Sequence, residues 1–390
     1  MTKGKILFII PTLCQGGLEH SLITALKLLD KSKYQVTLLI MQQVLDLLPL
    51  VPQEVEVLID KESPHYYRKP RAVWLKGVSE ISGRIGKQSI KEMYSEQLKR
   101  YIHLQRTIHP AKDIIGKRDF DVVVSYAVGM CTETALHVKA KKRVVFFHSS
   151  IDLNHEKNVE LFPKLDGIIA VSQGVKDMLC CSYDNIQDKV YVLENYVDAE
   201  LVIAKANQPL LNGFVSPENK LVLCTCGRFS KEKGFDLAVE SAHILKKSGV
   251  DFIWYFIGDG ALREALETQI AEYSLQDNIV ITGYVDNPFS YIKMCEIYVQ
   301  PSYHESFGLT IKEAMVLGKP IVSTDTVGAH TLLDNSEYGE IVDVNAEALA
   351  QGIIDAVEKK TRNKYVKFDI SVNESEKIEY IRKLEKLIDN

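Results

Sequence analysis

Short apolar runs alternate with longer amphipathic stretches along most of the chain. Runs that are apolar on both faces are typical of parallel strands covered by helices. Repeated strand–helix alternation therefore predicts right-handed parallel crossover units. The expected strands are 5–10, 35–41, 55–59, 122–126, 143–148, 167–172, 190–195, 221–227, 252–258, 279–284, 297–302, 320–325 and 340–344.

The intervening segments carry helical spacing. Leu18, Leu22, Leu26 and Leu29 form one stripe just after a Gly-Gly pair. The alternation pauses in a turn-rich stretch, and we place a domain junction at about 196–219. The fold class is α/β, with two doubly wound, Rossmann-like parallel sheets. Ligands of such sheets bind at the carboxyl ends of the strands, so candidate residues should follow strands.

Composition narrows the function classes. The 390 residues are 46% hydrophobic and 25% charged, which suits two globular domains, and the net charge of −5 argues against a general nucleic-acid binder. Seven cysteines without a CxxC pair predict reduced thiols in a cytoplasmic protein, and we expect Cys224 and Cys226 to be core residues. No apolar run approaches the roughly 18 residues of a membrane-spanning helix.

The segment 299–323 carries the strongest chemical signal. A strand ends at Gln300, Glu305 lies in the following loop, and a helix is expected from Ser306 or Phe307 to about Leu317. The free amides of its first turn can receive a phosphate. The alternative makes Glu305 a helix-cap carboxylate and Glu313, eight residues later, a solvated charge.

Further candidates also follow strands. Arg228 and Lys233 are five apart across a strand-to-helix turn, and a guanidinium with an ammonium suits a diphosphate, although surface cations are the alternative. His148 ends a strand, where a histidine is more often structural. The other candidates are Gly16, Gly17, Gly258 and Tyr284, each of which also has a purely structural interpretation.

Together, Arg228 to Lys233, 257–260, Gly283, the Glu305-x7-Glu313 pair and 318–320 resemble the family-four retaining glycosyltransferases of the GT-B fold (glycosyl transferases group 1). The landmarks 16–19, 170–172 and 195–198 are similar to that family as well. The resemblance implies a GT-B architecture with two Rossmann-like domains facing across a cleft. It assigns 1–195, joined by the C-terminal helix 374–390, to an acceptor-binding domain and 196–373 to a nucleotide-sugar-binding domain.

The resemblance also implies roles. Arg228 and Lys233 would hold the diphosphate, Glu313 the ribose hydroxyls, and His148 the donor sugar and reacting centre. Glu305 would lie near the donor sugar. The expected substrate-binding residues are Gly16, Gly17, Arg228, Lys233, Gly258, Tyr284, Glu305, Ser306, Phe307, Gly308, Leu309 and Glu313, and the expected catalytic residues are Glu305, His148, Arg228 and Lys233.

The expected function is retaining transfer of a hexose or N-acetylhexosamine from a nucleoside-diphosphate sugar, a UDP-sugar being favoured. The acceptor would be a glycan or lipid-linked glycan in bacterial surface polysaccharide or glycoconjugate synthesis. No cofactor is expected, because the nucleotide sugar is a substrate. The alternatives are a nucleotide-sugar epimerase or a phosphorylase on the same scaffold, and a non-catalytic nucleotide-sugar-binding protein.

Two sequence features concern possible metal binding and recognition of the donor sugar. Asp119-Phe-Asp121 resembles an acidic DxD metal site, but it leads into a buried strand and we interpret it as strand entry. No metal is expected, because Arg228, Lys233 and a helix N-terminus supply positive charge. After the strand 320–325 the family has a glycine followed by an acid, whereas here Gly328 has no acid after it until Asp334.

The segment 65–118 is strongly basic. It holds 13 Lys or Arg against 4 Asp or Glu, an excess of 9, with aromatic and aliphatic residues interleaved. Such a segment can lie on an anionic membrane, so we expect peripheral contact at the inner face of the cytoplasmic membrane. An ordinary solvated helix pair covering the first sheet is the equally weighted alternative.

Overall fold

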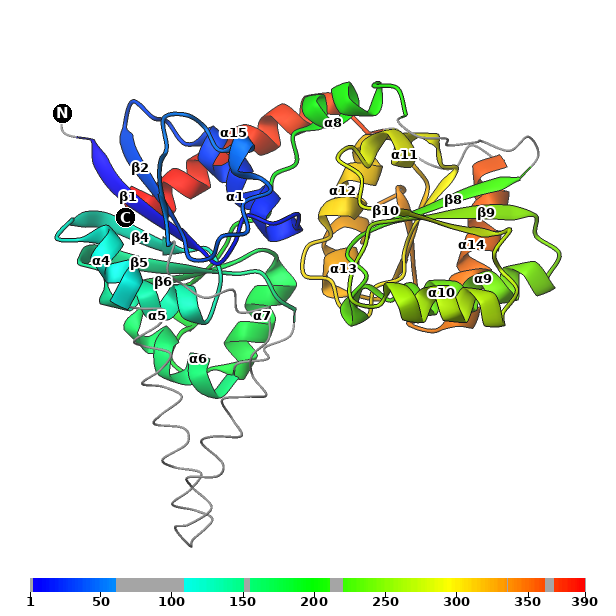
Figure 1. The fold of residues 1–390 in the computed structure, drawn as a ribbon, viewed down its shortest axis with the longest axis horizontal. Helices are drawn as coiled ribbons and strands as arrows, with labels where there is room; N and C mark the ends of the chain where they lie inside the picture. Colours follow the sequence, from blue (N-terminus) through cyan, green and yellow to red (C-terminus); the bar gives the residue numbers. More distant parts are fainter. Residues whose placement is uncertain are drawn as a thin grey trace, which may run out of the picture. The chain divides into compact units, whose positions relative to one another are not determined.

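The alternation of strands and helices is present throughout the computed structural model, which describes residues 3–60, 109–150, 155–210, 220–334, 336–361 and 368–389. These residues separate into two compact units (Figure 1). The first comprises 1–147, 154–169 and 185–190, and the second comprises 148–153, 170–184 and 191–390. The boundary expected at 195/196 stays a prediction.

The first unit is built on a seven-stranded sheet of order β3-β2-β1-β4-β5-β6-β7. Strand β1 is an interior strand that pairs in parallel with both β2 and β4. The strands are β1 (Gly4–Ile10), β2 (Tyr34–Ile40), β3 (Glu56–Ile59), β4 (Phe120–Ser125), β5 (Ala140–Phe147), β6 (Gly167–Ala170) and β7 (Val190–Val192). The helices around it are α1 (Gly17–Leu28), α4 (His109–Ile115), α5 (Met130–His137) and α6 (His155–Leu161), with short 3-10 turns at Leu48–Leu50, Phe162–Lys164 and Gln187–Lys189.

The second unit holds a six-stranded, wholly parallel sheet of order β10-β9-β8-β11-β12-β13. Its strands are β8 (Leu221–Cys226), β9 (Phe252–Ile257), β10 (Ile279–Gly283), β11 (Ile297–Gln300), β12 (Ile321–Thr324) and β13 (Gly339–Val342). Its helices are α7 (Gln173–Ser182), α8 (Ala199–Ala206), α9 (Phe235–Lys247), α10 (Arg263–Glu272), α11 (Phe289–Met294), α12 (Leu309–Val316), α13 (Val327–Leu333), α14 (Ala346–Thr361) and α15 (Ile370–Asp389), with a 3-10 turn at Lys231–Lys233.

Every expected strand is present, and both sheets have the doubly wound order, so the predicted fold class is confirmed. The strand order reverses between β1 and β4 in the first sheet and between β8 and β11 in the second. Helix α8 occupies part of the expected junction, and 211–219 lies outside the described residues. The C-terminal helix begins four residues before the predicted start, at Ile370.

Helices cover both faces of the second sheet, with α9, α10 and α14 on one and α11, α12 and α13 on the other (Figure 1). Successive strand residues alternate between the two cores: Leu223 packs with the first group, Val222 and Cys224 with the second. Cys226 also packs on the second group, as expected of core cysteines on one strand face.

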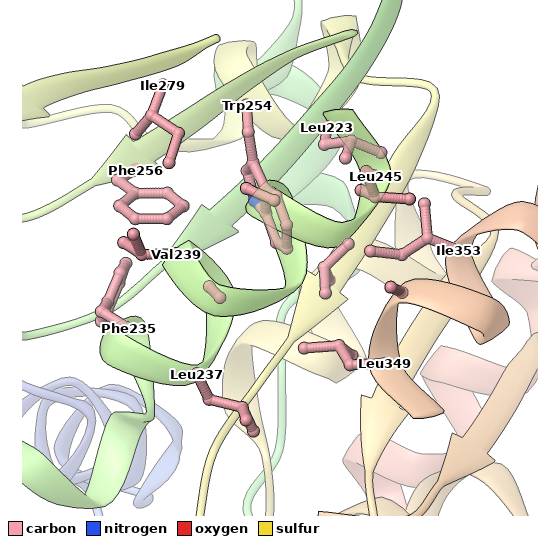
Figure 2. Packing of buried hydrophobic residues seen from close by; sticks show 14 of the residues in the cluster. Leu223, Phe235, Leu237, Val239, Leu245, Trp254, Phe256, Ile279, Leu349 and Ile353 are labelled. Atoms are coloured by element: carbon pink, nitrogen blue, oxygen red, sulfur yellow. The ribbon is translucent and has the colours of Figure 1, made fainter. Parts of the chain in front are cut away.

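Trp254 lies fully buried at the centre of the first of these cores, between Phe256 and Leu223 in the view of Figure 2. Its indole nitrogen donates to Thr225 Oγ1 at 3.0 Å, and that hydroxyl donates to the carbonyl of Val299 at 2.7 Å. One hydroxyl therefore joins β8, β9 and β11 inside the core, where unpaired polar groups are costly.

We predict that Thr225→Val lowers the free energy of unfolding of the second unit by about 1–3 kcal/mol, because it leaves a buried indole N–H and a carbonyl unpaired. Thr225→Ser keeps the hydroxyl and is the matched control. Urea unfolding followed by tryptophan fluorescence measures this in a Trp74→Phe background, where Trp254 is the single tryptophan. A Val variant as stable as the Ser variant would contradict it.

Candidate functional site

The candidate site of the second unit lies at the carboxyl ends of β8 and β11, which are neighbours in the sheet. Strand order reverses between these two strands, and such reversal points are where doubly wound sheets bind ligands. The chain leaves β8 at Cys226 into the loop that carries Arg228 and Lys233. It leaves β11 at Gln300 into the loop that carries Glu305.

Backbone contacts fasten these two loops together. The amides of Tyr303 and His304 donate to the carbonyl of Glu232 at 2.9 and 3.2 Å. Gly234 adopts a left-handed conformation, with φ 62°, and a Cβ there would lie 2.0 Å from the carbonyl oxygen of Pro301. Only glycine permits this approach, so Gly234 sets the separation of the loops.

The fastened loops bring Lys233 and Glu305 into an ion pair. Lys233 Nζ lies 2.6 Å from Glu305 Oε2, and the two side chains are 26% and 13% exposed. A half-buried pair is less screened by solvent than a surface pair. The helix-cap interpretation of Glu305 is therefore wrong: its carboxylate pairs with Lys233, and no side chain of the described residues caps α12.

Arg228 is exposed on the same loop. Burial opposes ionisation of the neighbouring Glu232, but a hydrogen bond from Ser230 and the charges of Lys233 and Arg228 hold the pKa of that carboxyl below its ordinary value. The structure thus gathers Arg228, Lys233 and Glu305 around one loop pair. With Glu232, the loop pair brings together two basic and two acidic side chains.

Helix α12 begins at Leu309, later than the predicted start at Ser306 or Phe307. The reason is Gly308, whose left-handed conformation (φ 86°, ψ 55°) is incompatible with a helix running through it. Phe307 lies in the loop, and Leu309 is the first helical residue. Across the described residues, the amides of the first turn of α12 receive no side-chain cap, which leaves them available to an anion.

Glu313 lies one turn further along α12. It is half-buried, and burial raises the pKa of its carboxyl to about 8, against the opposing charge of Lys205 on α8. The interpretation of Glu313 as a solvated charge is therefore wrong. Lys205 was not singled out from the sequence, where it is one cation among many.

The turns after β9 and β10 border the Arg228 loop. The amide of Gly258 donates to the carbonyl of Gly283 at 3.0 Å, and the amide of Phe229 donates to the carbonyl of Asp259 at 3.0 Å. Tyr284, directly after β10, is 50% exposed. Gly258 thus has a clear structural role, and ligand contacts of Gly258 and Tyr284 stay predictions.

The first turn of α13, which follows β12, contacts the Glu305 loop. The amide of Gly328 donates to the carbonyl of Glu305 at 2.8 Å, and a Cβ on Gly328 would lie 2.8 Å from Glu305 Cγ. Nearby, His330 bridges Asp325 and Asp334 at 2.8 Å each, and the hydrogen bonds to Asp334 and Asp325 raise the pKa of this histidine.

Two further contacts of the Glu305 loop were missed by sequence analysis. Ser172, the N-cap of α7, donates its hydroxyl to the carbonyl of Ser306 at 2.8 Å. Gln300 hydrogen-bonds side chains at both ends of the loop. An amide at the end of an otherwise apolar strand was the available signal for Gln300, whereas nothing local marks Ser172.

His148 directly follows β5, and burial lowers the pKa of its imidazole to about 3. The ring is therefore neutral at physiological pH. A neutral imidazole is suited to hydrogen bonding a substrate or a backbone group, and less suited to balancing an anion.

In the first unit, Gly16 precedes α1 and Gly17 is its first residue, and no described side chain caps this helix. Buried Glu19 accepts hydrogen bonds from Thr12 Oγ1 at 3.1 Å and from Cys14 Sγ at 3.0 Å. This carboxylate ties the loop after β1 to the first turn of α1, so the glycine pair is held in a defined turn.

Asp119 and Asp121 behave as strand-entry residues, as predicted. Asp121 Oδ2 accepts from the amide of Lys5 at 2.8 Å, Asp121 pairs with Lys141 at 2.7 Å, and Asp119 pairs with Lys139 at 3.0 Å. Within the described ranges, no group of three or more His, Cys, Asp or Glu side chains is arranged to hold a metal ion.

The basic segment 65–118 falls mostly outside the described residues, so its membrane role stays a prediction. Its last residue, Arg118, pairs with Glu56 at 2.8 Å. Among the helices that the structure describes, none combines the length and the apolar character needed to cross a bilayer.

Comparison with known proteins shows that residues 210–370 match the family described as glycosyl transferases group 1. A Campylobacter jejuni N-acetylgalactosamine-N,N'-diacetylbacillosaminyl-diphospho-undecaprenol 4-alpha-N-acetylgalactosaminyltransferase is 28% identical over 195 residues, which are 50% of this chain and 51% of that protein. A 2-deoxystreptamine N-acetyl-D-glucosaminyltransferase of Niallia circulans is 34% identical over 119 residues, 30% of this chain and 31% of that protein. The chain thus spans about half or less of the length of these relatives.

The fold has solved counterparts over its full length. The crystal structure of Anabaena Alr3699/HepE in complex with UDP and glucose superposes with a TM-score of 0.71 and 17% identity, covering 99% of this chain and 100% of that chain. At 17% identity, this structural similarity establishes the shared fold.

The burial of Glu313 predicts a pH dependence of stability. Its pKa is raised in the folded protein, so between about pH 4.5 and pH 8 the folded state binds more protons than the unfolded state. The free energy of unfolding therefore falls as pH rises through this window, by up to about 1.4 kcal/mol per pH unit.

We predict that Glu313→Gln flattens this slope and is more stable than the unaltered protein at about pH 8, since its side chain is neutral at every pH. Urea unfolding across the window measures it. Glu272→Gln, at an exposed position at the end of α10, is the matched control and should keep the slope. Parallel curves for Glu313→Gln and the unaltered protein would show that the Glu313 carboxyl is ordinary.

Proposed function

We propose that this chain, whose residues 210–370 match the glycosyl transferases group 1 family, is a retaining glycosyltransferase that uses a nucleoside-diphosphate sugar. The observation that carries the proposal is the half-buried Lys233–Glu305 ion pair beside the first turn of α12, whose amides face no cap from the described side chains. A cation, a carboxylate and free amides converge at the strand-order reversal, where a sugar diphosphate would need all three.

The proposed donor contacts begin at the diphosphate and continue to the sugar, the ribose and the base. Lys233 and Arg228 contact the diphosphate, and the amides of 307–309 receive a phosphate oxygen. Glu305 turns from Lys233 towards the hydroxyls of the sugar once the diphosphate engages the ammonium. The Glu313 carboxyl, whose pKa is raised to about 8, can both donate to and accept from hydroxyl groups, which suits it for the ribose. Ser306, Gly258 and Tyr284 complete the donor pocket, with Tyr284 bordering the base.

The reaction is driven by stabilising the leaving group. Bond breaking places negative charge on the β-phosphate while the sugar becomes oxocarbenium-like. Preorganised cations and amides that bind this charge more strongly than the ground state lower the barrier. With no protein nucleophile assigned, the acceptor hydroxyl attacks on the face that the phosphate leaves, and the departing phosphate takes its proton. Neutral His148 orients the sugar.

The donor and acceptor classes are proposed from relatives. The Anabaena structure contains UDP and glucose, and the Campylobacter relative is named for a diphospho-undecaprenol substrate. We therefore favour a UDP-hexose or UDP-N-acetylhexosamine donor and a glycan or lipid-linked glycan acceptor in surface polysaccharide synthesis. The first unit, with Gly16 and Gly17 after β1, would bind the acceptor, at the inner face of the cytoplasmic membrane.

We predict that Arg228→Ala and Lys233→Ala each lower kcat/KM by about 10²–10³, because each removes a charge-assisted contact to the leaving phosphate. Lys231→Ala, an exposed cation in the same turn, is the matched control and should keep the normal rate. Transfer of labelled sugar from a UDP-sugar panel to lipid-linked acceptors measures it. Equal rates in all three variants would sink the diphosphate assignment.

We also predict that transfer continues in excess chelator, because Arg228, Lys233 and the α12 amides supply the positive charge. The assay is run with EDTA, then with added Mg²⁺ or Mn²⁺. Loss of activity in chelator that the metal restores would return Asp119 and Asp121 to consideration as ligands.

A further inference from the structure

We propose that Gln300 is a positioning residue that holds the Glu305 loop and helix α12 in the register needed to bind one donor molecule. Gln300 is the last residue of β11 and is 1% exposed. A buried amide in a sheet core is costly unless its groups are paired. The inference rests on the proposed function, although one of its tests below does not.

The side chain of Gln300 spans the loop from one end to the other. Its amide nitrogen donates to Ser302 Oγ at 2.7 Å, at the beginning of the loop. Its amide oxygen accepts from Thr310 Oγ1 at 3.0 Å, in the first turn of α12. The side chain of Gln300 therefore connects both ends of the segment that carries Glu305 and the amides of 307–309, in addition to the contacts that Glu232, Ser172 and Gly328 make within it.

The side-chain oxygen of Gln300 also accepts a hydrogen bond from within the sheet. Tyr298, fully buried on β11, donates its hydroxyl to Gln300 Oε1 at 2.8 Å. Thr324 on β12 lies within hydrogen-bonding distance of the carbonyls of Gln300 and Ser302, at 3.1 and 2.6 Å. The Tyr298 contact restrains the side-chain amide of Gln300, and the Thr324 contacts restrain the backbone at residues 300 and 302.

Thr310 connects the side chain of Gln300 to the helix that carries Glu313. Thr310 and Glu313 are three apart on α12, so they lie on neighbouring parts of its surface. The Gln300–Thr310 bond ties the first turn of α12 to the end of β11, beside the core packing of Ile311 and the ion pair of Lys312 with Glu376. Losing it would shift the α12 amides and Glu313 relative to Lys233, which belongs to the other loop.

The test compares Gln300→Leu with Asn278→Leu. Asn278 is also a buried amide of the second unit, donating to the carbonyl of Phe252 at 3.2 Å, and it belongs to neither loop. We expect similar losses of thermal stability in both variants. Gln300→Leu alone should lower kcat by about 10- to 100-fold and weaken UDP binding in calorimetry, because small displacements of reacting groups are costly.

Thr310→Val and Thr310→Ser form a second pair that alters one hydroxyl and keeps the fold. Thr310→Ser retains the hydroxyl and should keep normal kcat and UDP affinity, whereas Thr310→Val should reproduce the Gln300→Leu defect. This pair decides the question if Gln300→Leu fails to fold. Normal kcat and UDP affinity in folded Thr310→Val would overturn the proposal.

Hydrogen exchange separates this proposal from the proposed function. In Gln300→Leu, the amides of 302–310 should exchange about tenfold faster or more, whereas Asn278→Leu should leave them unchanged. If no UDP-sugar binds the unaltered protein, the proposed function fails while this result still reports on Gln300. Unchanged exchange in folded Gln300→Leu would overturn the positioning role.

Discussion

The contact on which the candidate site depends is the backbone seam between the loop after β8 and the loop after β11. The carbonyl of Glu232 accepts hydrogen bonds from two amides of the other loop. Gly234 has no side chain, which permits the close approach of that loop. These are short-range backbone bonds, so they fix geometry more tightly than flexible charged side chains do. The Lys233–Glu305 ion pair is their consequence.

That seam acts together with a second constraint inside the sheet. Gln300 ties both ends of the Glu305 loop to the end of β11, and Thr225 joins β8 to β9 and β11 beneath it. Buried polar groups that are paired in this way are rigid and directional. A loop with such support is held by the core of the unit, although the loop itself lies at the edge of the sheet.

The electrostatics of the site follow from burial. Glu305 forms an ion pair with Lys233, whereas burial raises the pKa of Glu313, the residue proposed for the ribose, three residues after Thr310 on α12. Two carboxylates eight residues apart in sequence thus have different environments. The charge of Lys205 on α8 opposes the effect of burial, so the pKa of Glu313 also depends on a residue of another helix.

The sequence alone determined the strands, the two doubly wound sheets and the strand ends at which candidate residues lie, because apolar runs and their spacing are local properties. The tertiary structure decided the rest. The start of α12 depends on the conformation of Gly308, and Glu305 turned out to face Lys233, 72 residues away, instead of capping a helix. The roles of Gln300 and Ser172 also follow from contacts between segments distant in sequence, and periodicity carries no information about such contacts.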